Sequence, residues 1–244
     1  MKLLPFIPLP LLLLGVSSQD LETKNKCSYT LGKSVFACAE LTDVNKNVDQ
    51  FLTPNTRMLI IKTSEKAMFT PYHHNKTNYK YVVNYNIVEN NKLDIEEMAF
   101  YGMVNLRYMK INGNSYSRVK NHTFKGLDSL ELLNLAGNNI SEIEKDAFSG
   151  LQNLITLDIA NNNVDVVKSN LFSDLINLKT LLLERNNIKI VEENGFFGLT
   201  SLNLLDLNFN SIRTPTFSKF ATLKYGDKVE ELSNFKIVQK EQKE

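Results

Sequence analysis

The chain has 244 residues, a formal net charge of +1 and 43% hydrophobic residues. This length allows one elongated domain with a continuous core. The near-neutral charge gives no reason to expect a nucleic acid or an acidic membrane surface as a partner.

Residues 1–18 have the pattern of a secretory signal peptide. Lys2 is a short basic start, Leu3 to Leu14 is an apolar run, and Gly15 to Ser18 supplies small residues for cleavage. The alternative is an uncleaved anchor, but about 12 apolar residues fall short of the roughly 20 that a membrane span needs. No later segment is long and apolar enough to span a membrane. We therefore expect cleavage after Ser18 and a soluble, secreted, extracellular product with a formal charge of zero.

Residues 19–57 are predicted to form an N-terminal cap that shields the core of the following segment from water. They contain the two cysteines of the chain, Cys27 and Cys38. In a secreted protein two such cysteines most simply pair, and Ser28 to Phe36 is predicted to form a small hairpin between them. A redox-active thiol pair is the alternative, and the missing C-x-x-C spacing disfavours it.

Residues 58–223 contain a pattern that recurs every 24 residues. Its clearest copy, Leu130 to Leu151, has the form L-x-x-L-x-L-x-x-N-x-I-x-x-I followed by F-x-x-L. Leu133 and Leu135 are two positions apart, so they point to the same face of a short strand. One such coil can bury its apolar face only between neighbouring coils. The pattern predicts an α/β-type solenoid, a leucine-rich repeat horseshoe with a parallel β-sheet on the concave face and a mostly irregular or short helical convex side.

Two ladders of residues mark six regular coils. Each asparagine follows a strand, where its amide can satisfy backbone groups that the turn leaves unpaired. Each phenylalanine should stack on the side opposite the strands. The asparagines are Asn90, Asn114, Asn138, Asn162, Asn186 and Asn210, and the phenylalanines are Phe100, Phe124, Phe148, Phe172, Phe196 and Phe220.

One irregular coil precedes these six. Met58 to Thr63 is predicted to be its strand, in the same 24-residue register. Lys66 and Lys76 then stand where the asparagine and the phenylalanine should be. Phe69 to Lys80 is therefore expected to be an irregular outer connection.

Residues 224–244 form a tail that contains Val229, Leu232 and Phe235 before a polar end. A solenoid needs its ends covered, and an open last strand exposes unpaired backbone groups. Either this tail folds over the last coil as a cysteine-free cap, or another subunit covers the open edge. The second alternative implies a dimer through the C-terminal end.

Three glycosylation sequons agree with a secretory route, at Asn75, Asn121 and Asn139. Asn121 is expected on the outer side of its coil. Asn139 directly follows a ladder asparagine, so its side chain should point outward from the turn.

The ladders, the F-x-x-L segments and the secretory start resemble the typical 24-residue class of extracellular leucine-rich repeat proteins. That class includes Toll-like receptor ectodomains and small secreted immune proteins of insects, and the short two-cysteine cap is more similar to the latter. The resemblance implies recognition of a protein partner or a microbial surface molecule in innate immunity. The alternative is an extracellular matrix or adhesion protein, or a truncated receptor ectodomain, that acts through protein–protein assembly.

The variable positions of each strand should point out of the concave sheet, and they are the candidate binding positions. With the first leucine of a coil as zero, they are plus two, plus four, plus six and plus seven, where Glu184 and Asn208 also stand. Apolar residues among polar ones often mark an interface, although scattered exposed leucines are also normal. The candidates are Tyr108, Lys110, Leu132, Asn134, Asp158, Leu182, Arg185, Leu204, Asp206 and Phe209.

No catalytic residue, metal site or cofactor is predicted, and the chain is not expected to be an enzyme. Asp158 and Asp206 share a column but stand two coils apart, with no acid partner evident between them. His73 and His74 are adjacent on a loop, where their side chains diverge and no further ligand stands near enough to complete a metal site.

Overall fold

The computed structural model describes residues 26–30, 34–39, 44, 48, 51–62, 66–71, 78–88, 90, 92–212 and 236–238. The predicted signal peptide 1–18, the sequon at Asn75, the adjacent histidines and the apolar tail residues Val229 and Leu232 lie outside this part of the chain. Within the described residues no helix is long and apolar enough to cross a membrane.

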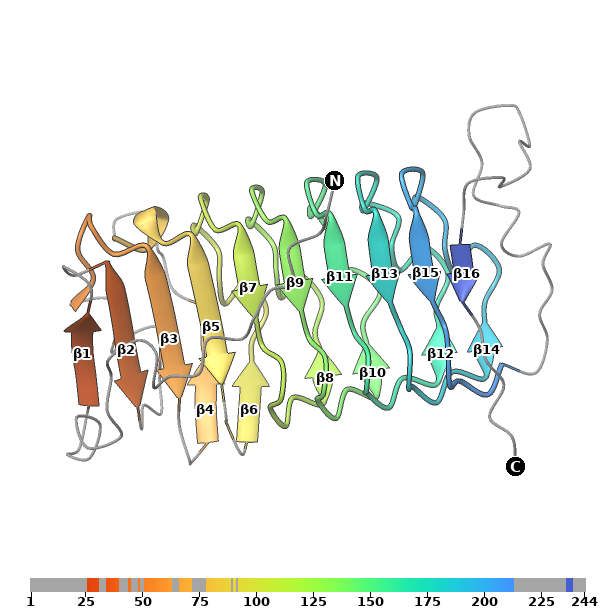
Figure 1. The fold of residues 1–244 in the computed structure, drawn as a ribbon, viewed down its shortest axis with the longest axis horizontal. Helices are drawn as coiled ribbons and strands as arrows, with labels where there is room; N and C mark the ends of the chain where they lie inside the picture. The colour runs from red at the N-terminus through yellow and green to blue at the C-terminus, as the bar shows by residue number, and fades with distance from the viewer. Residues whose placement is uncertain are drawn as a thin grey trace.

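One ten-stranded sheet runs the length of the molecule (Figure 1). β1 (Lys26–Thr30) is antiparallel to β2 (Val35–Ala39), and every later neighbour in the sheet is parallel. The other strands in sheet order are β3 (Met58–Lys62), β5 (Asn84–Val88), β7 (Tyr108–Lys110), β9 (Leu132–Asn134), β11 (Thr156–Asp158), β13 (Thr180–Leu182), β15 (Leu204–Asp206) and β16 (Lys236–Val238).

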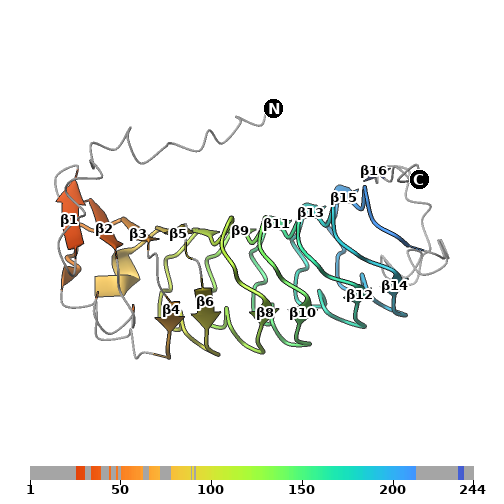
Figure 2. The same cartoon turned by 90° about the horizontal axis from the view of Figure 1, so that it is seen from below.

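Short strands on the opposite side form a second layer (Figure 2). They pair in parallel as β4 (Lys66–Phe69) with β6 (Lys92–Ile95), β8 (Arg118–Val119) with β10 (Glu142–Ile143), and β12 (Val166–Val167) with β14 (Ile190–Val191). A short 3-10 helix, η5 (Asn78–Tyr81), leads into β5. The parallel-sheet solenoid predicted from the repeats is confirmed.

The convex side of the described coils consists of turns and these short strands rather than short helices. Each F-x-x-L segment forms single turns, such as that closed by the bond from Leu127 N to Phe124 O at 3.3 Å. Backbone in the left-handed region, at Met98, His122, Asn170 and Asn194, interrupts the chain just before or within these turns. A residue with positive φ cannot continue a right-handed helix, so the turns stay short.

The core lies between the two layers and is continuous from the cap to the last described coil. Leu130, Leu133 and Leu135 are fully buried. The phenylalanines Phe100, Phe124, Phe148, Phe172 and Phe196 stack in one spine, with ring centroids 5.9–6.2 Å apart. Aromatic pairs at this spacing contribute about 0.5–1.5 kcal/mol each beyond their burial. Phe220 is outside the described residues.

The prediction for the first coil was partly wrong. β3 pairs with β5 so that Leu59 lies opposite Tyr85, 26 positions along the chain rather than 24. Phe69 is not in an irregular connection. It ends β4, is fully buried, and packs on Phe100 with centroids 5.8 Å apart, so it adds one ring to the spine. The 24-residue register hid this ring because the longer coil delivers it from a strand instead of from an F-x-x-L turn.

The ladder asparagines join each coil to the coil before it. The Asn138 amide donates to the carbonyl oxygens of Leu135 at 2.8 Å and of Ile111, one coil earlier, at 2.9 Å. Its Oδ1 accepts from the backbone N–H of Tyr116 at 3.2 Å. The same bridging occurs at Asn114, Asn162, Asn186 and Asn210.

Asn90 begins this ladder and differs from the others. Its N–H and its amide both donate to Oδ1 of Asn114, at 2.8 and 2.7 Å. Its own Oδ1 is buried with no hydrogen-bond partner among the described residues. The coil before it is 26 positions long instead of 24.

The two ends of the sheet are closed differently. At the N-terminal end Cys27 and Cys38 lie opposite each other in the β1–β2 hairpin and form a disulfide, as the sequence predicted. At the other end β16 pairs with β15, with Leu205 opposite Ile237. A segment of the tail therefore occupies the strand edge that the repeats leave open. The predicted dimer through this end stays a prediction.

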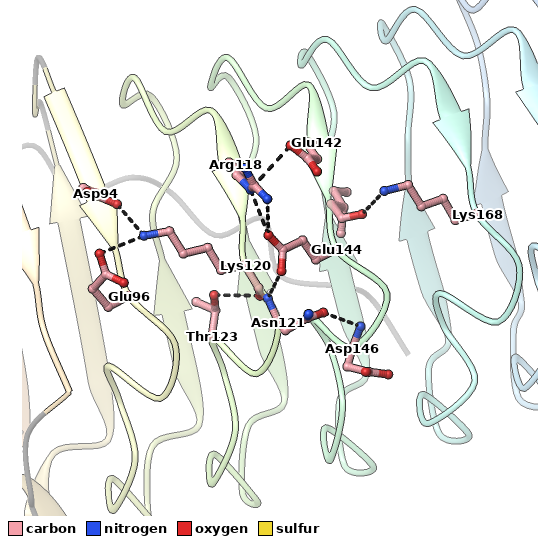
Figure 3. Close-up of polar contacts among 11 residues, drawn as sticks. Asp94, Glu96, Arg118, Lys120, Asn121, Thr123, Glu142, Glu144, Asp146 and Lys168 are labelled. Carbon is pink, nitrogen blue, oxygen red and sulfur yellow. Dashed lines mark hydrogen bonds and ion pairs between the residues drawn. The ribbon is translucent and has the colours of Figure 1, made fainter.

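Ion pairs tie neighbouring coils together across the convex face (Figure 3). Lys120 Nζ lies 3.0 Å from Asp94 and 2.8 Å from Glu96, one coil earlier. Arg118 pairs with Glu144, one coil later, at 2.7 Å. Exposed pairs of this kind contribute little individually, so they support the coil spacing rather than create it.

The sequon asparagine Asn121 belongs to the same network. Its Oδ1 accepts from the backbone N–H of Asp146 at 3.1 Å, and its own N–H donates to Glu144 at 2.8 Å. This backbone bond, more than the nearby Arg118, lowers the pKa of Glu144 against the opposing effect of burial. Asn121 is half-buried on the convex side and Asn139 is exposed; glycosylation of either stays a prediction.

The asparagine ladder yields a stability prediction. Asn162→Asp keeps the shape of the side chain but cannot donate to the carbonyl oxygens of Leu135, Ile159 and Ala160, to which the amide now donates. Leaving buried polar groups unpaired costs about 1–3 kcal/mol for each group. We expect the free energy of unfolding, from urea denaturation at pH 7, to fall by about 3 kcal/mol.

The matched control is Asn163→Asp. Asn163 is the exposed next residue, and its only described hydrogen bond is made by its backbone N–H. This variant should change the free energy of unfolding by less than about 0.5 kcal/mol. Equal losses in the two variants would contradict the assigned role of the ladder.

Candidate binding face

Side chains on the concave face form straight columns across the sheet. In each three-residue strand the middle residue is buried and the outer two are half-buried. The strand register aligns plus-two residues with plus-two residues and plus-four with plus-four. The first column contains Tyr108, Leu132, Thr156, Thr180 and Leu204, and the second contains Lys110, Asn134, Asp158, Leu182 and Asp206.

Three polar members of the plus-four column also hold the turn that follows their strand. Oδ1 of Asn134, Asp158 and Asp206 accepts from the backbone N–H two residues later, at 2.9, 3.0 and 2.9 Å respectively. Asn134 also donates to Asp158 Oδ2 at 3.1 Å. Side-chain bonds to the local backbone of this kind stabilise turns. These residues therefore have a structural role besides any contact with a ligand.

The register places Glu184 among the carboxylates of the concave face, which the sequence did not reveal. Its coil lies between those of Asp158 and Asp206. Burial, and then a hydrogen bond with Asp206 and repulsion from both neighbours, raise the pKa of Glu184, while Arg185 opposes the shift. Burial also raises the pKa of Asp158. The signal available in the sequence was the plus-six position of Glu184, but its significance depends on strand pairing.

Arg185 and Phe209 occupy the plus-seven positions of adjacent coils. The Arg185 guanidinium carbon lies 4.6 Å from the centroid of the Phe209 ring. Both residues have left-handed backbone, with φ of 53° and 56°. The preceding coils use Gly137 and Asn161 in this conformation, and those residue types adopt it most easily.

Bulky residues with positive φ are uncommon and carry backbone strain of about 1–3 kcal/mol. At the plus-seven position, therefore, Gly137 and Asn161 adopt the left-handed backbone easily, whereas Arg185 and Phe209 adopt it with strain. No buried polar network explains the change, since Arg185 is exposed. Its guanidinium lies over the Phe209 ring, so the two plus-seven side chains of these coils form one cation–π pair.

The apolar candidates on the strands are less exposed than the sequence suggested. Leu132, Leu182 and Leu204 are half-buried because their neighbours in the columns cover part of each side chain. Phe209 is half-buried as well. Among the described residues no group of three or more His, Cys, Asp or Glu side chains is placed to hold a metal ion.

The pKa of Glu184 leads to a pH-dependent prediction. A raised pKa means that the fold favours the protonated acid, so this stability is present below the unfolded pKa of about 4.3 and is lost as the pH rises. Glu184→Gln should raise the free energy of unfolding at pH 7 by at most about 1 kcal/mol, because partly exposed charges are screened. The gain should vanish below about pH 4 in urea denaturation.

Glu193→Gln is the control, since it removes an exposed glutamate on the convex side. It should change the free energy of unfolding at pH 7 by less than about 0.5 kcal/mol. A gain for Glu184→Gln that is the same at pH 4 and pH 7 would rule out the carboxylate repulsion.

The fold agrees with comparisons to known proteins. Residues 93–224 match the family model of the BspA type leucine rich repeat region, in six copies. That stretch is more than half of the chain. No protein with a curated description matches the sequence.

Solved structures share the architecture. One is the crystal structure of a TLR13–ssRNA13 complex, with 26% sequence identity and a TM-score of 0.64 over 76% of this chain and 25% of that chain. Another is an internalin (inlF) from Listeria monocytogenes str. 4b F2365, with 16% identity and a TM-score of 0.50 over 84% of this chain and 59% of that chain. The chain thus spans a quarter of the first protein and less than two thirds of the second, whose likeness concerns the fold alone.

Proposed function

The chain belongs to the BspA type leucine-rich repeat family, and we propose that it is a secreted recognition module that acts in innate immunity. Solenoids of this family are typically non-enzymatic scaffolds that recognise proteins or other ligands. The proposed ligand is a protein partner or a microbial surface molecule, bound on the concave face near Arg185 and Phe209.

The observation that carries this proposal is the left-handed backbone of Arg185 and Phe209. Strained backbone conformations cluster at active sites and ligand-binding sites. Arg and aromatic residues are also the types most enriched at interface hot spots. The half-buried Leu182 and Leu204 belong to the same two coils and offer apolar surface, and Glu184 and Asp206 of these coils offer carboxylates.

The proposed compartment and process have separate support. The Cys27–Cys38 disulfide is typical of oxidising environments outside the cytosol. The similarity to the TLR13 structure supports a role in innate immunity, at 26% identity over a quarter of that protein. The ssRNA in that complex is a ligand of TLR13, and the concave carboxylates Asp158, Glu184 and Asp206 of this chain do not favour a polyanion.

The proposal predicts that Arg185→Gly separates stability from binding. Glycine relieves the left-handed backbone, and Arg185 is exposed, so thermal unfolding should show a gain of about 1 kcal/mol. Binding should weaken at least tenfold, because the variant removes a hot-spot side chain. Asn161→Gly, at the equivalent position of the preceding coil, should leave binding unchanged.

The partner can be sought with wild-type and variant baits in parallel. Extracellular fluid and bacterial surface extracts are passed over immobilised wild-type chain, Arg185→Gly and Asn161→Gly, and captured molecules are quantified by mass spectrometry. A ligand held by wild type and Asn161→Gly but lost from Arg185→Gly supports the proposal. Capture that is equal on all three baits would show that this face is not the binding site.

A further inference from the structure

A polar groove of about 520 Å³ runs along the edge of the large sheet where β7, β9, β11 and β13 begin, the upper edge in Figure 1. Each of the four coils contributes the residue directly before its strand and the residue two positions earlier. The lining residues are Asn105, Arg107, Ser129, Glu131, Asn153, Ile155, Asn177 and Lys179. None of them is among the candidates predicted from the sequence. The volume is in the range of small-ligand sites, about 300–1,000 Å³.

Asparagine amides form a row of hydrogen-bond acceptors in this groove. Nδ2 of Asn105, Asn153 and Asn177 donates to a carbonyl oxygen of the preceding coil, at 2.8, 2.8 and 2.9 Å. These bonds set the orientation of each amide, so Oδ1 is the atom left for a ligand. Ser129 takes the equivalent place in the remaining coil, with a hydroxyl that donates or accepts. Neighbouring coils lie about 4.8 Å apart, so the acceptors repeat along the groove at that interval.

The other four residues add charge and one apolar contact. Arg107 donates from Nε to Glu131 Oε1 at 2.9 Å, and a second guanidinium nitrogen pairs with the same oxygen. Oε2 of Glu131 therefore remains available as an acceptor. Ile155 is 37% exposed in the middle of the groove, and Lys179 supplies donors at one end. Arg107 and Glu131 neutralise each other, so the lining keeps one formal positive charge, that of Lys179 at its end, and its other residues are uncharged.

A ligand that fits this groove is elongated, uncharged, rich in hydroxyl groups and only locally apolar. The amide oxygens and Glu131 can accept from sugar hydroxyls, Arg107 and Lys179 can donate to them, and Ile155 offers an apolar contact for the C–H face of a sugar ring. An extended peptide fits less well, because its backbone N–H groups alternate between two sides, whereas the amide acceptors form a single row. We propose that this groove is a second binding site that takes a short neutral oligosaccharide spanning the four coils.

The backbone beneath the groove is held by regular hydrogen bonds between coils. The carbonyl oxygens of Arg107, Glu131 and Ile155 each accept from two successive N–H groups of the next coil, at 2.8–3.1 Å. The backbone that supports the groove is therefore part of the sheet, which limits the entropy lost by the protein on binding. The groove involves other residues than the Arg185 face, so either proposal can fail without the other.

Isothermal titration calorimetry of the whole chain with defined sugars tests the proposal. The probes are cellotetraose, maltotetraose, mannotetraose and chitotetraose, with glucose as a monomer and a heparin tetrasaccharide as a charged comparison. We expect at least one neutral tetrasaccharide to bind, and to bind at least tenfold more tightly than glucose and the heparin fragment. No binding of any neutral tetrasaccharide at millimolar concentration would overturn the proposal, as would a preference for the heparin fragment.

Two variants test whether the sugar binds in the groove. Ile155→Asp removes the apolar contact and should weaken binding at least tenfold, and Glu131→Gln should weaken it severalfold while leaving thermal unfolding within a few degrees of wild type. Ile190→Asp changes an isoleucine that is 54% exposed on the convex side and should bind as wild type does. Equal affinity of wild type and Ile155→Asp for the sugar would contradict the assignment of the binding site to this groove. Arg185→Gly should retain the sugar, which separates this test from that of the concave face.

Discussion

The bond from the ladder asparagines Asn114 to Asn210 to a carbonyl oxygen of the preceding coil is the interaction on which the rest of the molecule depends. An amide at Asn138 or Asn162 has two donors and one acceptor, and the turn after each strand leaves two carbonyl oxygens and one N–H to match them. Neither a carboxylate nor an aliphatic side chain can satisfy all three. The ladder therefore fixes where each coil sits on the one before it, and the phenylalanine spine and the strand register follow from that spacing.

Because of this strand register, residues that recur along the sequence form continuous surfaces on the folded chain. Residues 24 positions apart stand side by side, so a column of variable side chains crosses the sheet and a row of amides follows its edge. The interior positions are used up by packing, which leaves recognition to the outward positions. Two residues at these outward positions differ in type from their equivalents in the preceding coils. Arg185 and Phe209 have the left-handed backbone conformation that Gly137 and Asn161 adopt without strain.

Much of the fold could be predicted because the same residue types recur at the same positions of each regular coil and make the same contacts there. The spine from Phe100 to Phe196 followed from spacing alone. Phe69 did not, because the coil between β3 and β5 has 26 positions and brings its ring in from β4. For the candidate site, the columns could be assigned from the pattern, but the pKa of Glu184 could not, since it depends on which carboxylates the neighbouring coils place beside it. The groove lined by Arg107, Glu131 and Ile155 could not be predicted, because these residues precede their strands and only the strand pairing brings them side by side.

The sequence by itself determined the architecture: the period, the buried positions, the two ladders and the disulfide pair. These are consequences of local chemistry that is the same in each coil. Only the tertiary structure decided which outward side chains meet, how far each is buried, which backbone is left-handed and what lies on the last strand edge, where β16 pairs with β15. Those features depend on contacts between residues that are distant in sequence or on the one coil that breaks the period, and a repeat pattern carries no information about either.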